Sequence, residues 1–262
     1  MYEFHTNKHW YFEMQYKNAK AFVIPFIEKH FKVGENIHVL EVGCAEGGVL
    51  KAFLDKGCTG VGVELEDGRL QLAETFLADE LAAGTVVLIN KNIYDPTFET
   101  AFRNKFDLIV LKDVIEHIPN QEKIIQEFKK FLKPGGNIFF GFPPWQMPFG
   151  GHQQLCKSFL SKVPYFHLLP MGIYKRILSY FNEHVPAFVE IKETGISTTR
   201  FERIVKETGY EIKRNTYFLL NPIYKYKFGL NPIEQFGFLK AIPPIRDFFT
   251  TCVYYLIALK EN

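Results

Sequence analysis

The chain has 262 residues, 47% of them hydrophobic and 23% charged, so its composition predicts a folded, soluble protein and excludes a disordered or fibrous one. Its 31 lysines and arginines against 29 acidic residues give a formal charge of +2, which excludes a whole-molecule electrostatic field for capturing nucleic acid. This length suffices for one well-buried domain with an insertion, or for two small domains.

Strand and helix patterns alternate through the first half of the chain. Apolar residues at helical spacing predict an introductory helix over Tyr16–Phe31, with Pro25 as a site for a kink. Short β-rich runs and amphipathic runs then alternate, and glycines end the helices. The predicted strands are Asn36–Val42, Val61–Leu65, Thr85–Asn90, Phe106–Leu111 and Asn137–Phe142, and the predicted helices between them are Gly47–Lys56, Arg69–Ala83 and Glu122–Leu132. This alternation predicts an α/β fold, a doubly wound, mostly parallel sheet with helices on both faces.

The alternation of strand and helix patterns stops after Phe142 and resumes later in the chain. Pro143-Pro144-Trp145 begins a stretch dense in aromatic residues and histidines, which we interpret as an insertion over the carboxyl edge of the sheet. The pattern returns with a helix at Thr198–Thr208 and strands at Tyr210–Leu220 and Thr250–Ala258. A proline-containing connection, residues 221–244, joins these two strands, which bring the predicted sheet to seven strands.

The cysteines and the two ends of the chain bear on the cellular location of the protein. Cys44, Cys58, Cys156 and Cys252 are far apart and form no Cys-x-x-Cys pair, so we expect reduced thiols rather than a zinc knuckle or a disulfide framework. The start of the chain has no basic stretch followed by an apolar one, so we expect no signal peptide. The apolar Cys252–Leu259 is shorter than the roughly 20 residues of a membrane-spanning helix. We therefore expect a cytoplasmic protein without a membrane span, and peripheral membrane contact stays open.

The turn after the first predicted strand combines an acidic residue with glycines. Glu41 lies within that strand, and Gly43 and Gly47 bracket the loop that follows. In open parallel sheets ligands bind beyond the carboxyl ends of the strands, where glycine lets the backbone approach them. Glu64, 21 residues after Gly43, ends the second strand, where a carboxylate accepts the hydroxyl hydrogens of an adenosine ribose. Together these residues predict a nucleotide-like cofactor site, although a glycine-rich turn alone is equally a tight strand-to-helix connection.

The same loop argues against two other nucleotide-binding classes. A dinucleotide enzyme needs Gly-x-Gly-x-x-Gly to admit a pyrophosphate, whereas the third residue of the loop here is Ala45. The negative charge of Glu41 would also repel a pyrophosphate. No Gly-Lys-Ser or Gly-Lys-Thr follows the strand, so the loop is not that of an NTPase. A carboxylate beside the loop instead suits a cofactor that carries positive charge, such as an amine and a sulfonium.

At these residues the chain resembles the class I S-adenosylmethionine-dependent methyltransferases. Their first motif, acidic-x-Gly-x-x-x-Gly, corresponds to Glu41, Gly43 and Gly47. The further matches are Glu64, Phe106-Asp107-Leu108-Ile109, Asp113-Val114-Ile115-Glu116-His117-Ile118 and Leu132-Lys133-Pro134-Gly135-Gly136. The resemblance implies a Rossmann-like sheet with its last strand antiparallel, S-adenosylmethionine as cofactor and S-adenosylhomocysteine as product. It divides the chain into an N-terminal helical segment (1–35), a cofactor-binding core (36–142), the insertion as substrate cover (143–195) and a C-terminal completion of the sheet (196–262).

The resemblance also implies roles for individual residues. The backbone of the loop would hold the methionine portion, and Glu41 would bind its amino group directly or through water. The loop residues concerned are Gly43, Cys44, Ala45 and Gly47. Glu64 would hold the ribose, and Leu65 would pack on the adenine, although Leu65 equally suits a core position.

Two further groups complete the implied cofactor site. The family often places an acidic residue after the third strand to bind the adenine amine, but this chain reads Asn90-Lys91-Asn92-Ile93-Tyr94, so Asn92 or the backbone around Ile93 takes that role. Asp113 and Val114 would line the sulfonium side. Their ordinary alternatives are a helix cap for Asp113 and a core position for Val114.

Two histidines are candidates for the base that takes a proton from an acceptor, a contribution of roughly 10²- to 10⁴-fold. His117 lies in the loop that borders the methyl site in the resembled family, and His152 follows Gly150-Gly151 just beyond the fifth strand. A structural role is the alternative for both. Some quinone-pathway O-methyltransferases with the same Glu-His pair bind a divalent metal there. Glu116 and His117 alone supply too few ligands, so we predict no metal and retain one as the alternative.

The insertion leaves the acceptor undetermined. Its aromatic residues would form a pocket or a hydrophobic dimer surface; they are Trp145, Phe149, Phe159, Tyr165, Phe166, Tyr174, Tyr180 and Phe181. Its cations suit a phosphorylated or carboxylated acceptor, or only a solvated surface; they are Lys157, Lys162, Lys175 and Arg176.

We expect a methyltransferase that acts at oxygen on a small-molecule or lipid- or sugar-linked acceptor, as a monomer or homodimer. The alternative is an S-adenosylmethionine-binding protein without transferase activity. Nucleic-acid methylation is disfavoured by the near-neutral charge and by the absence of an Asn-Pro-Pro-Tyr-like motif after the fourth strand.

Overall fold

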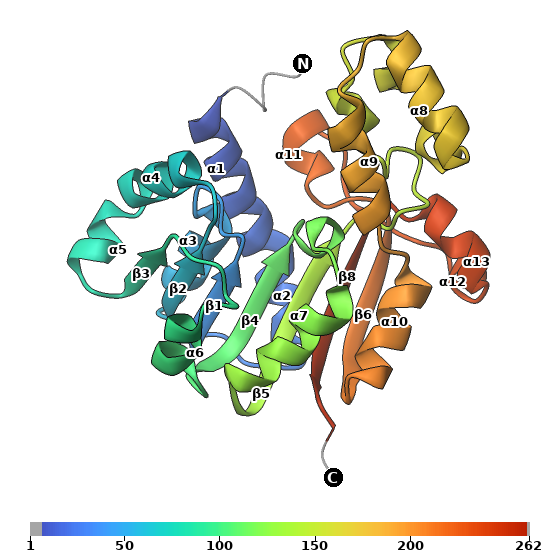
Figure 1. The fold of residues 1–262 in the computed structure, drawn as a ribbon. Coiled ribbons are helices and arrows are strands. Elements are labelled where there is room, and N and C mark those ends of the chain that lie inside the picture. Colours follow the sequence, from blue (N-terminus) through green and yellow to red (C-terminus); the bar gives the residue numbers. More distant parts are fainter. Residues whose placement is uncertain (1–6, 261–262) are drawn as a thin grey trace.

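The computed structural model describes residues 7–260, which form an eight-stranded sheet covered by helices (Figure 1). The strands are β1 (His38–Val42), β2 (Thr59–Val63), β3 (Val86–Ile89), β4 (Phe106–Lys112), β5 (Leu132–Phe142), β6 (Tyr210–Leu220), β7 (Ile233–Glu234) and β8 (Cys252–Leu259). Their order across the sheet is β3-β2-β1-β4-β5-β8-β6-β7. The expectation that the chain lacks a signal peptide concerns its start, where residues 1–6 lie outside the described range.

The predicted sheet topology is confirmed. Strands β1 to β5 are paired in parallel, and the last strand, β8, runs antiparallel to both of its neighbours, β5 and β6. The sequence did not predict the additional edge strand β7, which pairs antiparallel with β6. Because β7 has two residues, it is too short to show an alternating pattern.

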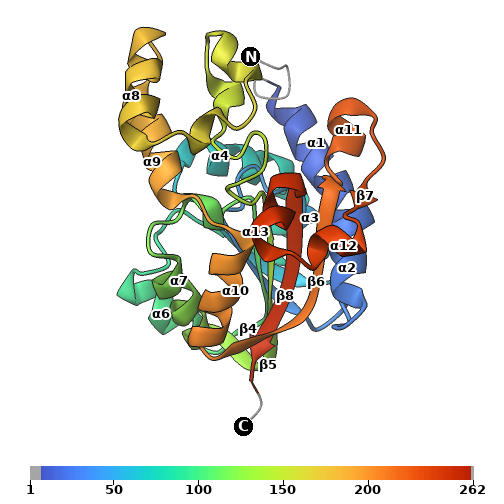
Figure 2. The same cartoon turned by 90° about the vertical axis from the view of Figure 1, so that its right-hand side faces the viewer.

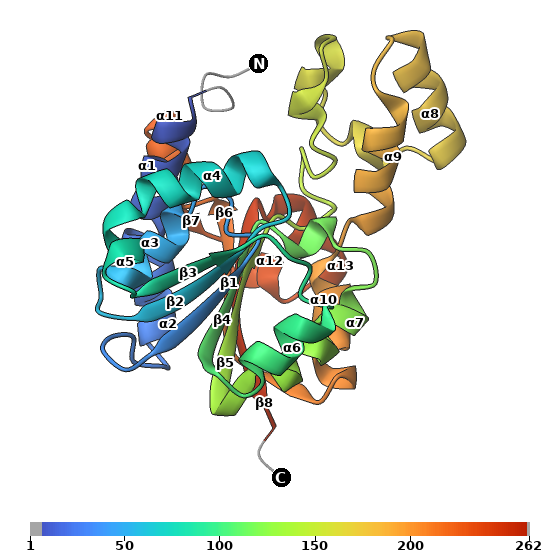
Figure 3. The ribbon, with the colours of Figure 1, turned by 60° about the vertical axis from the view of Figure 1, so that its left-hand side comes forward.

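Side chains that alternate along the strands build one core on each face of the sheet. Val39 and Val110 point to the face covered by α1 (Lys8–Asn18), α2 (Ile24–Glu28) and α3 (Gly48–Leu54). Leu40 and Ile109 point to the opposite face, covered by α6 (Pro96–Phe102), α7 (Gln121–Glu127) and α10 (Thr198–Glu207). Figure 3 shows the two helical layers on either side of the sheet, with α4 (Asp67–Phe76) and α5 (Ala78–Ala82) on the α3 side. Nearly continuous apolar strands are therefore buried on both faces.

The introductory helix begins earlier than predicted. It starts at Lys8, where the Asn7 side chain accepts a hydrogen bond from the Trp10 N–H at 3.0 Å, an N-cap. A π-helical turn, Ala19–Val23, separates α1 from α2 and lies directly before the predicted kink at Pro25. Because proline lacks an N–H and crowds the carbonyl four residues before it, a wider turn accommodates Pro25 without ending the helix.

Strand β5 also begins earlier than predicted. The proline and glycines of Lys133-Pro134-Gly135-Gly136 form a turn, with Gly135 at φ +77°, and this turn is a bulge within the strand. Opposite it, the partners of Phe106 and Leu108 on β4 are Leu132 and Asn137. The turn residues indicated the local conformation correctly, whereas the pairing of Leu132 depends on β4.

The insertion folds around its own small core and leaves the sheet at one place. It contains α8 (Met171–Tyr180) and α9 (Val185–Thr194), which the sequence did not predict, and it buries Tyr174 and Leu178. The Trp145 N–H donates to the Ile196 carbonyl at 2.8 Å, so the two ends of the insertion lie side by side. Figure 2 shows α8 standing away from the sheet.

The connection between β6 and β8 also contains short helices. These are α11 (Tyr224–Phe228), α12 (Gly237–Lys240) and α13 (Pro243–Arg246), which the sequence did not predict (Figure 2). Within residues 7–260, no helix combines the length and the apolar content that crossing a bilayer requires.

Candidate active site

The loop between β1 and α3 is a tight turn fixed to the end of β2. The N–H groups of Gly43 and Cys44 donate to the Val63 carbonyl at 2.8 and 3.0 Å, and the Gly47 N–H donates to the Cys44 carbonyl at 2.8 Å. Gly43, Ala45 and Gly47 all have positive φ, at +68°, +51° and +85°. This left-handed backbone favours glycine, so the sequence pattern has a direct conformational cause.

Gly43 also has no space for a side chain. A Cβ at this position would lie 2.7 Å from Cγ2 of Val114, at the end of β4. We expect Gly43→Ala to lower the free energy of unfolding by about 1–3 kcal/mol, because the substitution adds backbone strain and a steric overlap. Urea denaturation measures this loss. In a Val114→Ala background the overlap is removed and the strain remains, so the loss should become smaller without disappearing.

Gly68→Ala is the matched control for this prediction. Gly68 lies in the first turn of α4, its φ is not positive, and no atom lies within 4 Å of a Cβ built there. Alanine in a helix should leave stability unchanged or raise it by up to about 1 kcal/mol. Equal losses for Gly43→Ala and Gly68→Ala would contradict the explanation.

Glu64 connects the ends of β1 and β2 through its carboxylate. Its Oε2 accepts the N–H of Ala45 at 2.9 Å, and its Oε1 accepts the N–H groups of Leu65 and Glu66 at 2.9 and 3.0 Å. A carboxylate offers about four lone-pair directions, so roughly one remains on Oε2 for a further donor. The predicted ribose contact fits one hydroxyl directly, and a second hydroxyl would have to share an oxygen with a backbone N–H.

These loops surround a cavity of about 450 Å³, within the range of small-molecule sites. All predicted cofactor residues except Gly47 line it, namely Glu41, Gly43, Cys44, Ala45, Glu64, Leu65, Asn92, Ile93, Asp113 and Val114. Gly47 instead precedes α3, where a Cβ would lie 2.8 Å from Leu77. Leu65 is 65% exposed, and Asn92 accepts the Tyr94 N–H at 3.1 Å. The structure therefore brings residues from four strand ends to one cavity.

Glu41 is a buried acidic group in the wall of this cavity. It is 3% exposed, and its Oε2 has no hydrogen-bond partner. Burial, and to a smaller extent the charge of Glu64, raise the pKa of Glu41 well above its usual range. A cation in the cavity would supply the missing partner and stabilise the ionised carboxylate.

The N-terminal helix closes the cavity, which the sequence did not predict. Tyr11 and Gln15 of α1 line it, and the Gln15 Nε2 donates to the Tyr11 hydroxyl at 3.0 Å. Helix α1 packs tightly on α3, since a Cβ at Gly48 would lie 2.5 Å from the Phe12 carbonyl. The separation of Tyr11 and Gln15 by one helical turn was the available signal, but only the packing of α1 on α3 directs both toward the cavity.

A second unpredicted pair lies beside the glycine loop. Glu46 is 1% exposed and accepts two hydrogen bonds from Arg69 of α4, Nε to Oε1 at 3.2 Å and Nη2 to Oε2 at 3.0 Å. Lys8 of α1 donates to the same carboxylate at 3.1 Å. Both Glu46 and Arg69 line the cavity. This bidentate pair holds the loop, α4 and α1 in one arrangement.

The end of β4 places a charged pair at the opposite wall. Asp113 has φ +57° and contacts the Lys112 Nζ through Oδ2 at 2.5 Å. Burial opposes the charge of Lys112, but the Asp113 carboxylate outweighs it and raises the pKa of Lys112 above its usual value. Burial, and then the charge of Asp113, also raise the pKa of Tyr11. Asp113 and Tyr11 of the N-terminal helix therefore line the same cavity.

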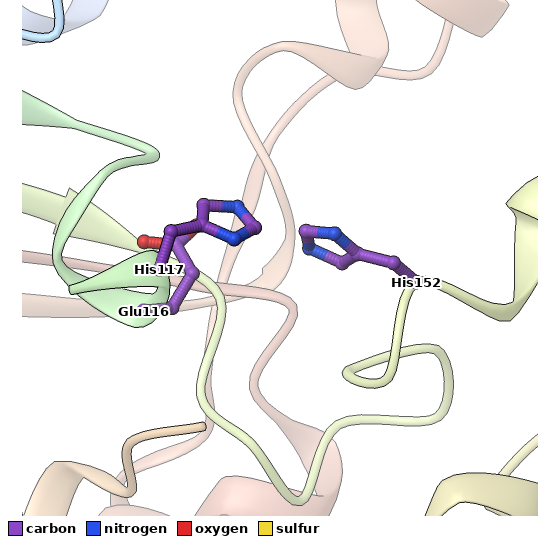
Figure 4. A group of neighbouring side chains, drawn as sticks. All are labelled: Glu116, His117 and His152. Carbon is purple, nitrogen blue, oxygen red and sulfur yellow. The ribbon is translucent and has the colours of Figure 1, made fainter. Parts of the chain in front are cut away.

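The two predicted histidines lie against one another. Their ring centroids are 4.9 Å apart at an interplanar angle of 60°, and Figure 4 shows the ring from the loop after β4 facing the ring from the insertion. His117 lines the cavity, whereas His152 contacts it through His117. Partial desolvation lowers the pKa of His117, and burial followed by the neighbouring His117 lowers the pKa of His152 to about 4. Both rings are therefore neutral near pH 7 and can accept a proton.

Glu116 joins the two histidines as a candidate cation site. The ligand atoms of Glu116, His117 and His152 all lie within 4.8 Å of one another, and both carboxylate oxygens of Glu116 are buried without hydrogen-bond partners. Two ligands bound to one cation at 2.0–2.2 Å are at most about 4.4 Å apart, so small side-chain movements bring the three together. Two imidazoles and a carboxylate suit zinc or a similar transition metal better than magnesium.

The aromatic residues of the insertion do not line this cavity. Phe166 and Tyr174 form part of the insertion's own core, whereas Phe159 and Tyr180 are exposed. His167 is fully buried, with its Nε2 2.7 Å from the Trp145 carbonyl, so it has a structural role in the insertion. The aromatic residues of the insertion therefore form no substrate pocket within this cavity.

Comparison with known proteins places the chain among methyltransferases. The ubiquinone biosynthesis O-methyltransferase of Coxiella burnetii is 28% identical over 103 residues, which are 39% of this chain and 42% of the relative, so the match spans about two fifths of that protein. The enzyme of the same description from Hydrogenovibrio crunogenus is 26% identical over 203 residues, 77% of this chain and 73% of the relative.

The solved structures agree in fold. Geranyl diphosphate C-methyltransferase from Streptomyces coelicolor A3(2), crystallised with Mg²⁺, geranyl diphosphate and S-adenosyl-L-homocysteine, superposes with a TM-score of 0.57 at 15% identity, covering 91% of this chain and 80% of that one.

A family model described as a methyltransferase domain matches residues 14–188. This range is more than half of the chain and includes the glycine loop, both histidines and the residues that line the cavity, apart from Tyr11 and Phe12. The family expected from the motifs of the first half is thus confirmed. The chain belongs to the methyltransferase-domain family.

Proposed function

We propose that the protein is an S-adenosylmethionine-dependent methyltransferase that methylates an oxygen of a small-molecule or lipid- or sugar-linked acceptor. The observation that carries the proposal is the single cavity in which the glycine loop, Glu41, Glu64 and His117 meet. The relatives named as O-methyltransferases support oxygen as the acceptor atom. A cytoplasmic location and a monomeric or homodimeric state stay predictions.

The residues fit the cofactor at its charged and polar ends. The unpartnered Oε2 of Glu41 matches an ammonium group, and the free acceptor direction on Glu64 matches a ribose hydroxyl. Leu65 and Ile93 supply apolar surface for a base. When bound there, S-adenosylmethionine supplies an electrophilic methyl group on a sulfonium. The chain's own part is to align the acceptor and to take its proton.

The histidine pair is suited to hold that proton. His117 reaches the cavity, and its neutral imidazole can accept a proton from a hydroxyl within hydrogen-bond distance. His152 packs against the ring and shields it from solvent on the insertion side. The charge of Asp113 favours the imidazolium that results, since it opposes the lowering of the pKa of His117.

Binding and turnover together test the proposal. Calorimetry with S-adenosylhomocysteine measures cofactor binding, and transfer of a labelled methyl group to catechols, phenols, sugars, carboxylic acids and amines measures the reaction. We expect binding and methylation of at least one hydroxyl acceptor. Binding without turnover on the whole panel would support the alternative of a cofactor-binding protein without transferase activity. Failure to bind would refute both.

The raised pKa of Glu41 predicts a pH dependence of cofactor binding. In the empty cavity burial favours the protonated carboxyl, whereas an ammonium ligand favours the ionised form, so binding releases a proton. The affinity for S-adenosylhomocysteine should therefore rise with pH from the usual glutamate pKa of about 4.3 up to the raised pKa of Glu41 in the empty cavity, by at most about tenfold per pH unit. Calorimetry in buffers of different ionisation enthalpy measures the protons released.

Glu41→Gln provides the control, because the amide keeps the shape of the side chain and does not titrate. The variant should bind more weakly and lose the pH dependence. The same proton release in the variant and in the parent protein would assign it to another group.

A divalent cation at Glu116, His117 and His152 is the second candidate for the catalytic device. The observation that favours it is the pair of buried, unpartnered oxygens on Glu116 beside two imidazoles. Such a cation would supply a positive charge that lowers the pKa of an acceptor hydroxyl. The test is titration with Zn²⁺ or Mn²⁺ followed by calorimetry, with His152→Ala as the variant. Binding that His152→Ala abolishes would support the cation; absence of binding, with activity retained in a chelator, would leave the histidine base.

A further inference from the structure

The insertion carries an exposed surface, here called the tip patch, that combines apolar and basic side chains. It consists of Leu155, Lys157, Phe159, Lys162, Ile173, Lys175, Arg176 and Tyr180, all of which are exposed. None of these residues lines the cofactor cavity. In Figures 1 and 3, α8, which contributes half of the patch, lies at the edge of the molecule away from the sheet.

The aromatic part of the patch is exposed although the insertion has a core of its own. Phe159 is 62% exposed and Tyr180 is 79% exposed, and both rings lie 5.0 Å from the ring of Phe181. The opposite side of α8 buries Tyr174 and Leu178 completely. Helix α8 is therefore apolar on two sides, and only one of them has a partner within the described residues.

The charges of the patch have a single sign. Residues 152–182 contain four lysines and arginines and no aspartate or glutamate. The next acidic residue, Glu183, is 8% exposed and accepts the N–H groups of Lys157 and Ser158 at 3.0 and 2.8 Å. Its buried carboxylate interacts with the charge of Lys157, and the segment supplies no acidic residue near Lys162, Lys175 or Arg176 in sequence. The tip patch thus combines exposed cations with exposed apolar side chains, which is complementary to a negatively charged surface with an apolar interior.

The same hydrogen bonds make the patch a fixed surface. Glu183 ties the loop that carries Lys157 and Phe159 to the turn between α8 and α9. The ring contacts of Phe181 then hold Phe159 beside the end of α8. The backbone that carries Lys157 and Phe159 is therefore held in place before a partner binds, which reduces the entropic cost of docking.

We propose that the tip patch docks the protein on the surface of a bilayer that contains anionic phospholipid. Lysine and arginine interact with the lipid phosphates, and Phe159, Tyr180, Leu155 and Ile173 enter the boundary between headgroups and acyl chains. A nucleic acid would match the cations but not the aliphatic residues, and a second copy of the chain would bring like charges together. The proposal does not depend on methyl transfer, because it concerns a surface outside the cofactor cavity.

Flotation of the full chain with vesicles tests the proposal. The probes are vesicles of phosphatidylcholine alone and of phosphatidylcholine with phosphatidylglycerol. We expect binding to the second kind only, weakened by added salt. Lys175→Gln combined with Arg176→Gln should weaken the partition coefficient roughly 25-fold, at about fivefold per charge. Phe159→Ser combined with Tyr180→Ser should weaken it at least about tenfold, because two aromatic side chains no longer enter the interface.

Matched variants elsewhere on the surface show whether position matters. Phe236→Ser with Phe238→Ser removes two exposed aromatic rings from the connection before β8, and Lys29→Gln with Lys32→Gln removes two exposed cations near the start of β1. Both controls should float like the parent protein, and every variant should keep its melting temperature and its calorimetric response to S-adenosylhomocysteine. If the parent protein itself gave no calorimetric response to S-adenosylhomocysteine, that result would contradict the proposed function and would not bear on the docking proposal.

Three kinds of result would each refute the docking proposal. Failure of the parent protein to float with the phosphatidylglycerol vesicles, or equal flotation of the tip-patch variants, refutes the proposal. Binding of a short DNA duplex without vesicle binding would identify a nucleic acid as the partner. A dimer in sedimentation equilibrium that Phe159→Ser with Tyr180→Ser dissociates would show that the patch binds a second copy, and would also overturn it.

Discussion

Replacing His117 with alanine is expected to lower the rate of methyl transfer roughly 10²- to 10⁴-fold, the contribution of a positioned general base, with the affinity for S-adenosylhomocysteine unchanged. His117 lines the cavity and is neutral near pH 7, so its removal leaves an acceptor hydroxyl without a proton acceptor. The measurement is the single-turnover rate with the best acceptor of the panel, beside calorimetry. His184→Ala, which replaces an exposed histidine of the insertion, is the matched control and should leave the rate unchanged.

The pH profile separates a base from a structural role. Only a neutral imidazole accepts a proton, so the rate should fall as the pH drops through the pKa of His117. Because desolvation lowers that pKa, the fall should occur below about pH 6.5, the usual value for histidine. His152→Ala should lower the rate less, since His152 contacts the cavity only through His117. Unchanged rates in both variants would leave alignment as the protein's whole contribution.

Replacing Glu64 with glutamine is expected to weaken S-adenosylhomocysteine binding roughly 10- to 150-fold, about 1.5–3 kcal/mol for hydrogen bonds to a charged group. The carboxylate serves twice: it accepts three backbone N–H groups of the loops and has an acceptor direction open to the cavity. Glutamine keeps the shape but turns an amide NH₂ toward those N–H donors. Calorimetry measures the affinity, and thermal unfolding should show a loosened loop in the ligand-free protein.

Glu66→Gln is the matched control for this prediction. Glu66 lies two residues further along, is exposed, and contributes only its backbone N–H to the Glu64 carboxylate. Its substitution should change neither affinity nor melting temperature. An unchanged affinity in Glu64→Gln would refute the assignment of Glu64 to the ribose.

The residues that the sequence identified share a local cause. Gly43 and Gly47 occupy positive-φ positions, and Glu64 ends a strand adjacent to theirs, so both features follow from neighbouring residues and from the topology of a parallel sheet. Helix α6 had a local signal as well, since Asp95 caps it by accepting the Thr97 N–H at 2.7 Å and Pro96 begins it. An N-cap aspartate followed by proline is a sequence signal for the start of a helix.

The features that the sequence did not predict depend on contacts between distant segments. Tyr11 reaches the cavity only because α1 packs on α3, and Arg69 meets Glu46 only because α4 lies beside the glycine loop. His117 and His152 were both selected, but their contact depends on how the insertion returns over the sheet. Residue type and spacing determine local conformation, whereas these pairings are set by tertiary packing.

The hydrogen bond between Trp145 and Ile196 has an evolutionary consequence. Because the two ends of the insertion meet at this hydrogen bond, a change of length between His152 and Thr194 would leave the register of β5 with β8 unchanged. Variation in this segment is thus separable from the cofactor-binding loops, whereas His152 and Thr194 tie the two ends of the insertion to His117 and Gln121.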